Sequence, residues 1–281
     1  MFNNKLVTAG EHLCRHLYNG MVAQEFWDNA QYSHLTITRR PGEFRLFIQE
    51  ALALNMAGRL LVAAESAAKQ VDAEQPGFLA YLEAIVISWD LERLDTDGRL
   101  CRLIRDAHSA KCNISKTLHK QLENWAVKHH PLCYLCGVPL DFDSNSQHNR
   151  FTLDHIWPEN YGGDSISDNL LPCCDACNSG KKCDFATWAA CDVHSFMISK
   201  DPSANEMSTI SGRMRFALHN RAVRTYANKR NCSLKEAYLR IGPWLDEPWP
   251  LSEDDAGDFF NLANYEPNRC QPYGNQLLRL S

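Results

Sequence analysis

The residues with the clearest chemical meaning lie in one short part of the chain. Two pairs of cysteines have the spacing Cys-x2-Cys, and they are Cys133 with Cys136 and Cys174 with Cys177. Four thiolates in two such pairs form the ligand set of a tetrahedral structural zinc site. Asp154 and His155 lie between the pairs, and Asn178 directly follows the last cysteine. A carboxylate, an imidazole and an amide can bind a hard cation and take a proton from water, so the segment predicts a reactive centre beside the zinc.

The identity of the third zinc ligand is open between two neighbours, because Cys173 directly precedes Cys174. We favour Cys174, since it forms the second Cys-x2-Cys pair with Cys177. The further cysteines Cys183 and Cys191 are not assigned to the metal. The chain starts without an apolar leader segment, so we expect a cytoplasmic protein whose reduced thiols bind metal.

The overall charge does not favour nucleic-acid binding, because the 281 residues carry a formal net charge of -5. A local basic segment lies at residues 207–240, where Glu236 is the single acidic residue. We expect this segment to contact the nucleic-acid backbone; the alternatives are an ordinary solvated helix face or pairing with the acidic C-terminal tail. The candidate contacts are Lys181, Lys182, Arg213, Arg221 and Arg224. The most apolar stretch, residues 51–64, is too short to cross a bilayer, so no membrane partner is expected.

Apolar residues at helical spacing indicate the elements around this centre. They predict helices from Phe44 to about Val71, from Phe78 to Leu94, from Leu100 to His108 and from Ser115 to Val127. Short β-prone pieces and a helix beginning near Asp175 replace them at residues 129–192. Ser233 and Glu236 form a capping-box pattern at the start of a later helix. We therefore predict a helical N-terminal domain at 1–128, a central domain at 129–192 and a helical C-terminal region at 193–281.

Residues 133–182 resemble an HNH endonuclease of the ββα-metal class in its zinc-stapled form. The matching elements occur in the family's order, and they are Cys133-Tyr-Leu-Cys136, Leu153-Asp154-His155-Ile156-Trp-Pro158, Gly162-Gly163, Asn169-Leu170 and Cys174-Asp-Ala-Cys177-Asn178. The resemblance implies a mainly α protein with a small central α+β ββα-metal (HNH) nuclease domain. The family often has histidine at its last motif position, where this chain has Asn178.

The resemblance implies roles that agree with the chemistry of phosphodiester hydrolysis. His155 is the expected general base, and Asp154 and Asn178 are the expected ligands of one divalent cation, Mg²⁺ or Mn²⁺. Asn169 is expected to hold the His155 ring or the loop backbone. Neighbouring residues of a strand point to opposite faces, so Asp154 can hold the cation while His155 addresses the water. Cleavage in this family leaves a 5′-phosphate and a 3′-hydroxyl.

DNA is the expected substrate, because HNH-type enzymes mostly cut DNA. The resemblance also suggests a nuclease effector of bacterial anti-phage defence, with an ATPase as a partner protein. Two alternatives stay open from the sequence. One is an RNase of the same fold, and the other is a non-catalytic zinc module that binds nucleic acid or forms a scaffold.

Overall fold

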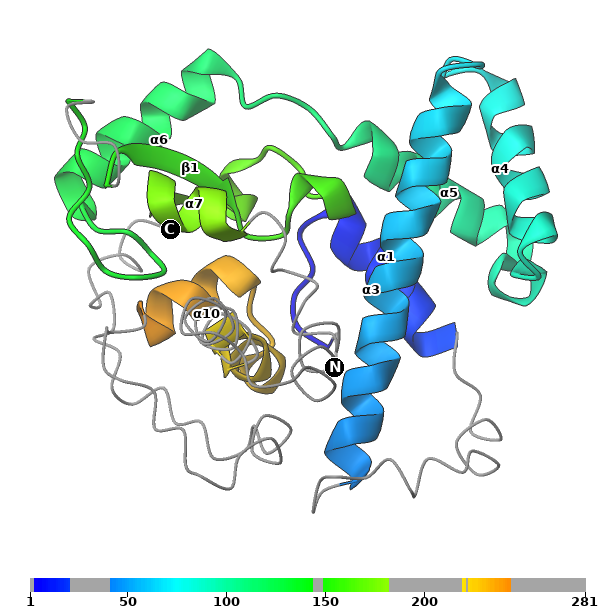
Figure 1. The fold of residues 1–281 in the computed structure, drawn as a ribbon, viewed down its shortest axis with the longest axis horizontal. Helices are drawn as coiled ribbons and strands as arrows, with labels where there is room; N and C mark the ends of the chain where they lie inside the picture. Colours follow the sequence, from blue (N-terminus) through cyan, green and yellow to red (C-terminus); the bar gives the residue numbers. More distant parts are fainter. Residues whose placement is uncertain (1–2, 21–40, 144–148, 182–218, 221, 244–281) are drawn as a thin grey trace, which may run out of the picture.

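The computed structural model describes residues 3–20, 41–143, 149–181, 219–220 and 222–243. These residues form a mostly helical protein with one small β-hairpin, which confirms the predicted fold class (Figure 1). The helices are α1 (Ala9–Gly20), α3 (Pro41–Ala68), α4 (Pro76–Ser88), α5 (Arg99–Ser109), α6 (Lys116–His129), α7 (Asp175–Lys181) and α10 (Leu234–Ile241). The strands are β1 (Phe151–His155) and β2 (Leu170–Cys174). Short 3₁₀ helices are η2 (Glu92–Leu94), η3 (Thr96–Gly98), η4 (Glu159–Tyr161) and η5 (Ser167–Asn169).

Serine side chains cap the first turns of two helices. The Ser115 hydroxyl accepts a hydrogen bond from the Leu118 amide at the start of α6. At the start of α10 the Ser233 hydroxyl accepts from the Glu236 amide, and the Glu236 carboxylate accepts from the Ser233 amide. Both arrangements use amide groups that have no partner within the helix. The predicted capping box is confirmed.

The predicted helix from Phe78 to Leu94 is shorter in the structure, because α4 ends at Ser88. Asp90 has a positive φ of 54°. The Leu91 amide donates to the Val86 carbonyl and the Asp90 amide donates to the Ile87 carbonyl. These two bonds form a Schellman motif, which closes a helix and turns the chain away. The sequence pattern continued past this point because Leu91 and Leu94 are also buried.

Helix α1 packs directly against the loop that joins the two strands. The Gly10 amide donates to the Gly162 carbonyl at 2.8 Å, and the Ala9 amide donates to the Asp164 carboxylate at 2.8 Å. A Cβ atom on Gly10 would lie 1.9 Å from the Tyr161 carbonyl oxygen, so only glycine allows this close approach. The N-terminal helices therefore support the loop that follows β1.

One cluster of buried hydrophobic side chains runs through all of these parts. It includes Leu13 of α1, Leu60 of α3, Trp157 of the loop after β1 and Tyr238 of α10. Figure 1 shows α1, α3, α4 and α5 beside the part that contains β1, α6 and α7. Among the described helices, none is long and apolar enough to cross a membrane.

Candidate active site and metal centre

A hairpin followed at once by a helix carries the predicted site residues. Strands β1 and β2 pair in antiparallel fashion, with Phe151 opposite Cys174 and His155 opposite Leu170. Helix α7 begins at Asp175, directly after β2, and contacts both strands. This connection places Cys174 at the end of β2, and Cys177 and Asn178 in the first turn of α7, beside the strand that carries Asp154 and His155.

The four predicted zinc ligands come together although the two pairs are distant in the sequence. The Sγ atoms of Cys133, Cys136, Cys174 and Cys177 all lie within 4.8 Å of one another. The Sγ atoms of Cys136 and Cys174 are 3.8 Å apart. A tetrahedral zinc with Zn–S bonds of about 2.3 Å would separate its sulfurs by roughly 3.8 Å. The cluster therefore fits a structural zinc site, and it is the only group of three or more metal-binding side chains among the described residues.

Hydrogen bonds among the thiols redistribute their protons. The Cys136 thiol lowers the pKa of Cys133 to about 4, and the Cys133 and Cys136 thiols lower the pKa of Cys174. The same contacts raise the pKa of Cys136 and Cys177. The four thiols are therefore close enough to share protons, and a bound zinc ion would take the place of those protons.

Cys173 lies outside the four-thiol group, although its Sγ atom is 3.7 Å from that of Cys133. Its neighbour Cys174 faces the other side of β2, because side chains alternate along a strand. Burial, together with the hydrogen bond between Cys173 and Cys133, raises the pKa of Cys173 well above its usual value. The geometry therefore favours Cys174 as the zinc ligand.

Asp154 is buried in β1 and accepts a hydrogen bond from a tyrosine of the first cysteine pair. The Tyr134 hydroxyl donates to Asp154 Oδ2 at 2.6 Å. Such a short bond is typical of a hydroxyl that donates to an ionised carboxylate. The sequence analysis predicted Asp154 as a site residue but missed Tyr134. The position of Tyr134 between two predicted zinc ligands, Cys133 and Cys136, could have indicated that it lies near the site.

His155 is half-buried and lies at the end of β1, on the face opposite Asp154. Its Nε2 atom is 2.9 Å from the Ser165 hydroxyl oxygen. Ser165 donates its one hydroxyl proton to the Cys112 carbonyl, so its oxygen accepts a proton from Nε2. This arrangement favours the tautomer that carries a proton on Nε2. Ser165 has no signal in the sequence motif and was missed.

Asn169 is buried and holds the loop backbone. Its Oδ1 atom accepts from the Trp157 amide at 2.8 Å. Its Nδ2 atom donates to the carbonyls of Trp157 and Asp164, both at 3.0 Å. Asn169 was expected to hold either the His155 ring or the loop backbone. The hydrogen bonds of its side chain are to the loop backbone.

Asn178 connects α7 to β1 through its amide nitrogen. Nδ2 donates to the Thr152 hydroxyl at 3.1 Å and to the Leu153 carbonyl at 3.3 Å. Thr152 and Asp154 are two residues apart in the strand and so share a face. Among the described residues, no hydrogen bond is made to Asn178 Oδ1. The Asp154 carboxylate and the Asn178 amide oxygen are the hard donors that Mg²⁺ and Mn²⁺ prefer, so the two residues fit a divalent cation chemically.

The predicted role of Arg224 in gripping nucleic acid needs a correction. Its guanidinium is buried and pairs with Glu50 of α3 at 2.5 Å. A side chain that is removed from solvent and already neutralised is not placed to contact a phosphate backbone. Lys182, Arg213 and Arg221 lie outside the described residues. Lys181 ends α7, and its side chain is also outside the described part.

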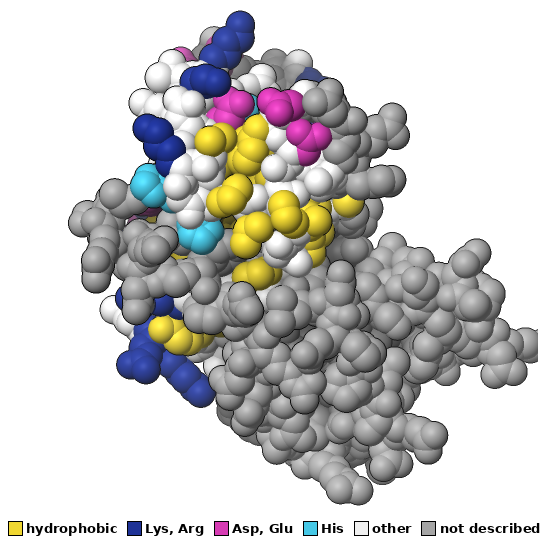
Figure 2. Space-filling model, turned by 90° about the vertical axis from the view of Figure 1, so that its left-hand side faces the viewer, with side chains coloured by type: hydrophobic (Ala, Val, Ile, Leu, Met, Phe, Trp, Pro, Cys, Tyr) yellow, Lys and Arg dark blue, Asp and Glu magenta, His cyan; other side chains and the backbone are white. Residues whose placement is uncertain are grey.

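Figure 2 shows one face of the molecule, on which the described hydrophobic side chains gather in the middle and Lys and Arg side chains lie at the upper, left and lower edges. Val127 of α6 is 53% exposed. The described part of this face therefore mixes hydrophobic, acidic and basic groups.

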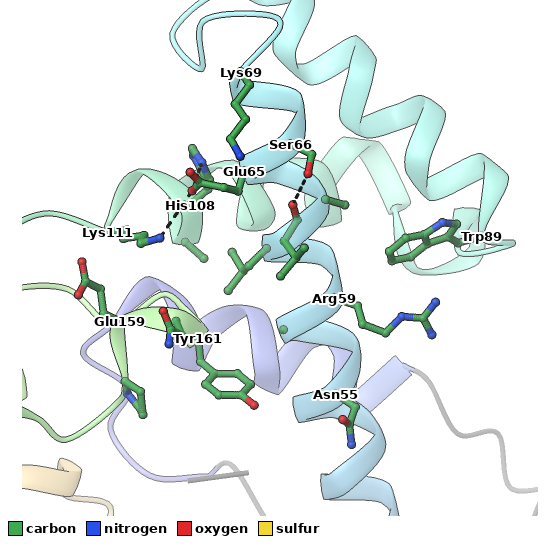
Figure 3. Close-up of a pocket in the computed structure, with 17 residues that line it drawn as sticks. Asn55, Arg59, Glu65, Ser66, Lys69, Trp89, His108, Lys111, Glu159 and Tyr161 are labelled. Carbon is green, nitrogen blue, oxygen red and sulfur yellow. Dashed lines mark hydrogen bonds and ion pairs between the residues drawn. The ribbon is translucent and has the colours of Figure 1, made fainter. Parts of the chain in front are cut away.

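A cavity of about 890 Å³ lies away from the predicted catalytic residues, between α3, the end of α5 and the η4 loop (Figure 3). Glu65 pairs there with His108 at 3.5 Å and with Lys111 at 3.6 Å. The cavity is not lined by Asp154, His155, Asn169 or Asn178. Lys111 lines the cavity and directly precedes Cys112. The Cys112 carbonyl accepts from the Ser165 hydroxyl, which in turn contacts the His155 ring, so these residues connect the cavity to His155.

A two-stranded hairpin, a following helix and a four-cysteine cluster are the parts of a zinc-stapled ββα nuclease domain. Comparison with protein families agrees, because the HNH endonuclease family model matches residues 133–187. The chain therefore carries an HNH endonuclease family domain, and the match covers about a fifth of its length. Searches of curated proteins and of solved structures gave no match.

Proposed function

We propose that this protein is a metal-dependent endonuclease that hydrolyses phosphodiester bonds in DNA. The observation that carries the proposal is the arrangement of β1 and α7 within the HNH domain. An acid and a base stand on opposite faces of one strand, and an amide oxygen lies on the helix beside it. A nucleic-acid substrate follows from the family, whereas the preference for DNA rests on the resemblance.

His155 is the proposed general base, which takes a proton from the attacking water. Ser165 accepts a hydrogen bond from Nε2 and is itself held by the Cys112 carbonyl, so it orients the ring. Asn169 holds the loop backbone after β1, which fixes the position of Trp157, two residues after His155. These residues orient the base before substrate arrives.

Asp154 and Asn178 are the proposed ligands of one divalent cation, Mg²⁺ or Mn²⁺. When bound, such a cation neutralises charge on the phosphate and stabilises the departing oxygen. Asp154 supplies the single negative charge of the ligand pair, and Asn178 supplies a neutral oxygen. This small ligand set leaves coordination positions for phosphate oxygens and water.

The four cysteines are the proposed ligands of a structural zinc. They join the loop before β1 to the junction of β2 and α7, so that zinc would fix the hairpin against the helix. A cytoplasmic setting, in which thiols stay reduced, suits such a site.

The test is cleavage of supercoiled plasmid DNA and of a structured RNA, each with Mg²⁺, with Mn²⁺ and with EDTA. Metal-dependent nicking or linearisation of the plasmid is expected, with little cleavage of the RNA. The opposite preference would identify an RNase of the same fold. A folded, zinc-loaded protein that binds both nucleic acids and cuts neither would support the non-catalytic module.

We also propose a biological setting, as the nuclease effector of a bacterial anti-phage system with an ATPase partner. This proposal rests on the resemblance of the HNH domain and its helical additions. Co-expression with the genes that neighbour its own, followed by purification, should recover an ATPase that stimulates cleavage. A purified protein that is fully active alone would contradict it.

A further inference from the structure

The Tyr134 side chain links the zinc-binding loop to the carboxylate of Asp154. Tyr134 follows Cys133 in the first cysteine pair, and its hydroxyl donates to Asp154 Oδ2 at 2.6 Å. The side chains of both residues are buried, with Tyr134 at 1% and Asp154 at 6% exposure. A charge-assisted bond in a buried environment is among the stronger hydrogen bonds of a protein.

The position of the Tyr134 hydroxyl is fixed from several sides. The Tyr134 amide donates to the Pro172 carbonyl of β2 at 3.0 Å. Its ring packs edge to face against Tyr238 of α10, with the ring centroids 5.0 Å apart. A zinc ion bound by Cys133 and Cys136 would also hold the backbone on either side of Tyr134. A donor that is held this firmly can fix the orientation of the carboxylate that accepts from it.

The neighbouring Tyr238 shows that this contact is specific to Tyr134. Tyr238 is equally buried, but its hydroxyl donates to Asn220 at 3.2 Å. Two tyrosines in edge-to-face contact thus have different hydrogen-bond acceptors. Of these two hydroxyls, that of Tyr134 is the one that contacts a residue of the proposed cation site.

We propose that Tyr134 is a positioning residue, whose hydroxyl orients the Asp154 carboxylate for binding the divalent cation. This inference rests on the proposed function of Asp154 as a cation ligand. A carboxylate has two oxygens and about four lone-pair positions, so it can accept this bond and bind a cation at the same time. Partners that hydrogen-bond to a metal ligand typically change metal affinity or activity about 10- to 100-fold.

The proposal also connects the two metal sites. The same loop supplies two zinc ligands and the hydroxyl that orients Asp154. Displacement of this loop by loss of zinc would move the hydroxyl away from the carboxylate. The structural zinc would then influence cation affinity through Tyr134, in addition to its effect on folding.

The experiment compares wild type with Tyr134→Phe and with the matched control Tyr238→Phe. Each variant removes one hydroxyl and keeps the edge-to-face contact of the two rings. The measurements are Mn²⁺ binding by electron paramagnetic resonance in the absence of nucleic acid, the Mn²⁺ concentration for half-maximal cleavage, and zinc content. Tyr134→Met, which also lacks the hydroxyl, replaces Tyr134→Phe if the latter does not retain zinc.

We expect Tyr134→Phe to weaken Mn²⁺ binding about 10- to 100-fold at unchanged zinc content, with cleavage restored at high Mn²⁺. Tyr238→Phe should bind Mn²⁺ as wild type does. Equal Mn²⁺ affinity in wild type and Tyr134→Phe would overturn the proposal while leaving the proposed nuclease intact. Wild type that binds no Mn²⁺ would overturn both the cation site and the role of Tyr134.

Discussion

At the residue scale, the side chains that do chemistry depend on neighbours that hold them. Asn169 makes three hydrogen bonds to the backbone of the loop after β1. His155 is held through Ser165, and Asp154 is held through Tyr134. The proposed catalytic groups are therefore positioned by buried or half-buried polar contacts.

Replacement of Asn169 by alanine should destabilise the protein. The change leaves the Trp157 amide and two carbonyl groups without their partner. We expect the free energy of unfolding to fall by about 2–4 kcal/mol, because each buried polar group left unsatisfied costs roughly 1–3 kcal/mol. Urea denaturation followed by circular dichroism measures this change.

The control is Asn160→Ala in the same loop. Asn160 is exposed, so its replacement should change the unfolding free energy by less than about 0.5 kcal/mol. Equal effects of the two substitutions would show that the hydrogen bonds of Asn169 do not hold the loop.

The chemical residue types were readable from the sequence, but their supporting contacts were not. Two cysteine pairs, Asp154, His155 and Asn178 stand out by type and spacing. Ser165 does not, because its contact with Cys112 joins segments that are distant in the chain. Tyr134 was visible only as a spacer between two cysteines.

At the element scale, the hairpin and α7 bring the two cysteine pairs together. The pairing of Phe151 with Cys174 fixes where β2 ends and where α7 begins. The four thiols then lie within the distances that one tetrahedral ion requires.

Substitution of Cys173 and of Cys174, one at a time, should show which of the two residues binds zinc. Cys174→Ser should lose zinc, because it removes one of the four clustered thiols. Cys173→Ala should retain one zinc per chain, since Cys173 lies outside that group. Zinc content is measured by elemental analysis of the purified proteins. Loss of zinc from Cys173→Ala and its retention by Cys174→Ser would reverse the assignment.

Local patterns predicted some element boundaries and failed at others. The capping box at Ser233 correctly predicted the start of α10, because capping depends on residues that are adjacent in the chain. The predicted end of α4 at Leu94 was wrong. The Schellman motif that ends the helix has Asp90 at the position with positive φ, where glycine is usual, so no stop signal was visible there in the sequence. Leu91 and Leu94 are buried after the helix has ended, so the apolar pattern in the sequence continues past Ser88.

At the scale of the whole molecule, one hydrophobic core joins the N-terminal helices, the hairpin and α10. The division at residues 128 and 192 stays a prediction. The buried pair of Arg224 and Glu50 connects α3 with the segment that precedes α10. Long-range contacts of this kind have no local sequence signal, which explains why Arg224 was misread as a surface cation.

Arg224→Ala should destabilise the protein by about 3–5 kcal/mol, because it leaves the buried Glu50 carboxylate unpaired. Thermal and urea unfolding measure the effect. Lys229→Ala is the matched control, since Lys229 is an exposed cation in the same segment. Weaker DNA binding by a fully stable Arg224→Ala protein would instead restore the role of Arg224 as a phosphate contact.

Acid should destabilise the molecule through His219. Burial lowers the pKa of His219 to about 3, below its ordinary value of 6.5. Below pH 6.5 the unfolded chain therefore binds a proton that the folded protein excludes, and stability falls as pH decreases from 6.5 toward 3. Between pH 7 and pH 5 the free energy of unfolding should fall by about 2 kcal/mol less in His219→Leu than in wild type. Urea unfolding at the two pH values measures this difference. An identical loss in both proteins would contradict this.

The most direct test of the proposed nuclease is the cleavage rate of supercoiled plasmid by His155→Ala in Mg²⁺ or Mn²⁺. His129→Ala, which removes an exposed histidine of α6, is the matched control. We predict that His155→Ala loses at least about 100-fold in rate at unchanged zinc content, because general-base catalysis contributes roughly 10²–10⁴-fold. His129→Ala should cleave as wild type does. A His155→Ala protein that cleaves at the wild-type rate would contradict the assignment of His155 as the general base.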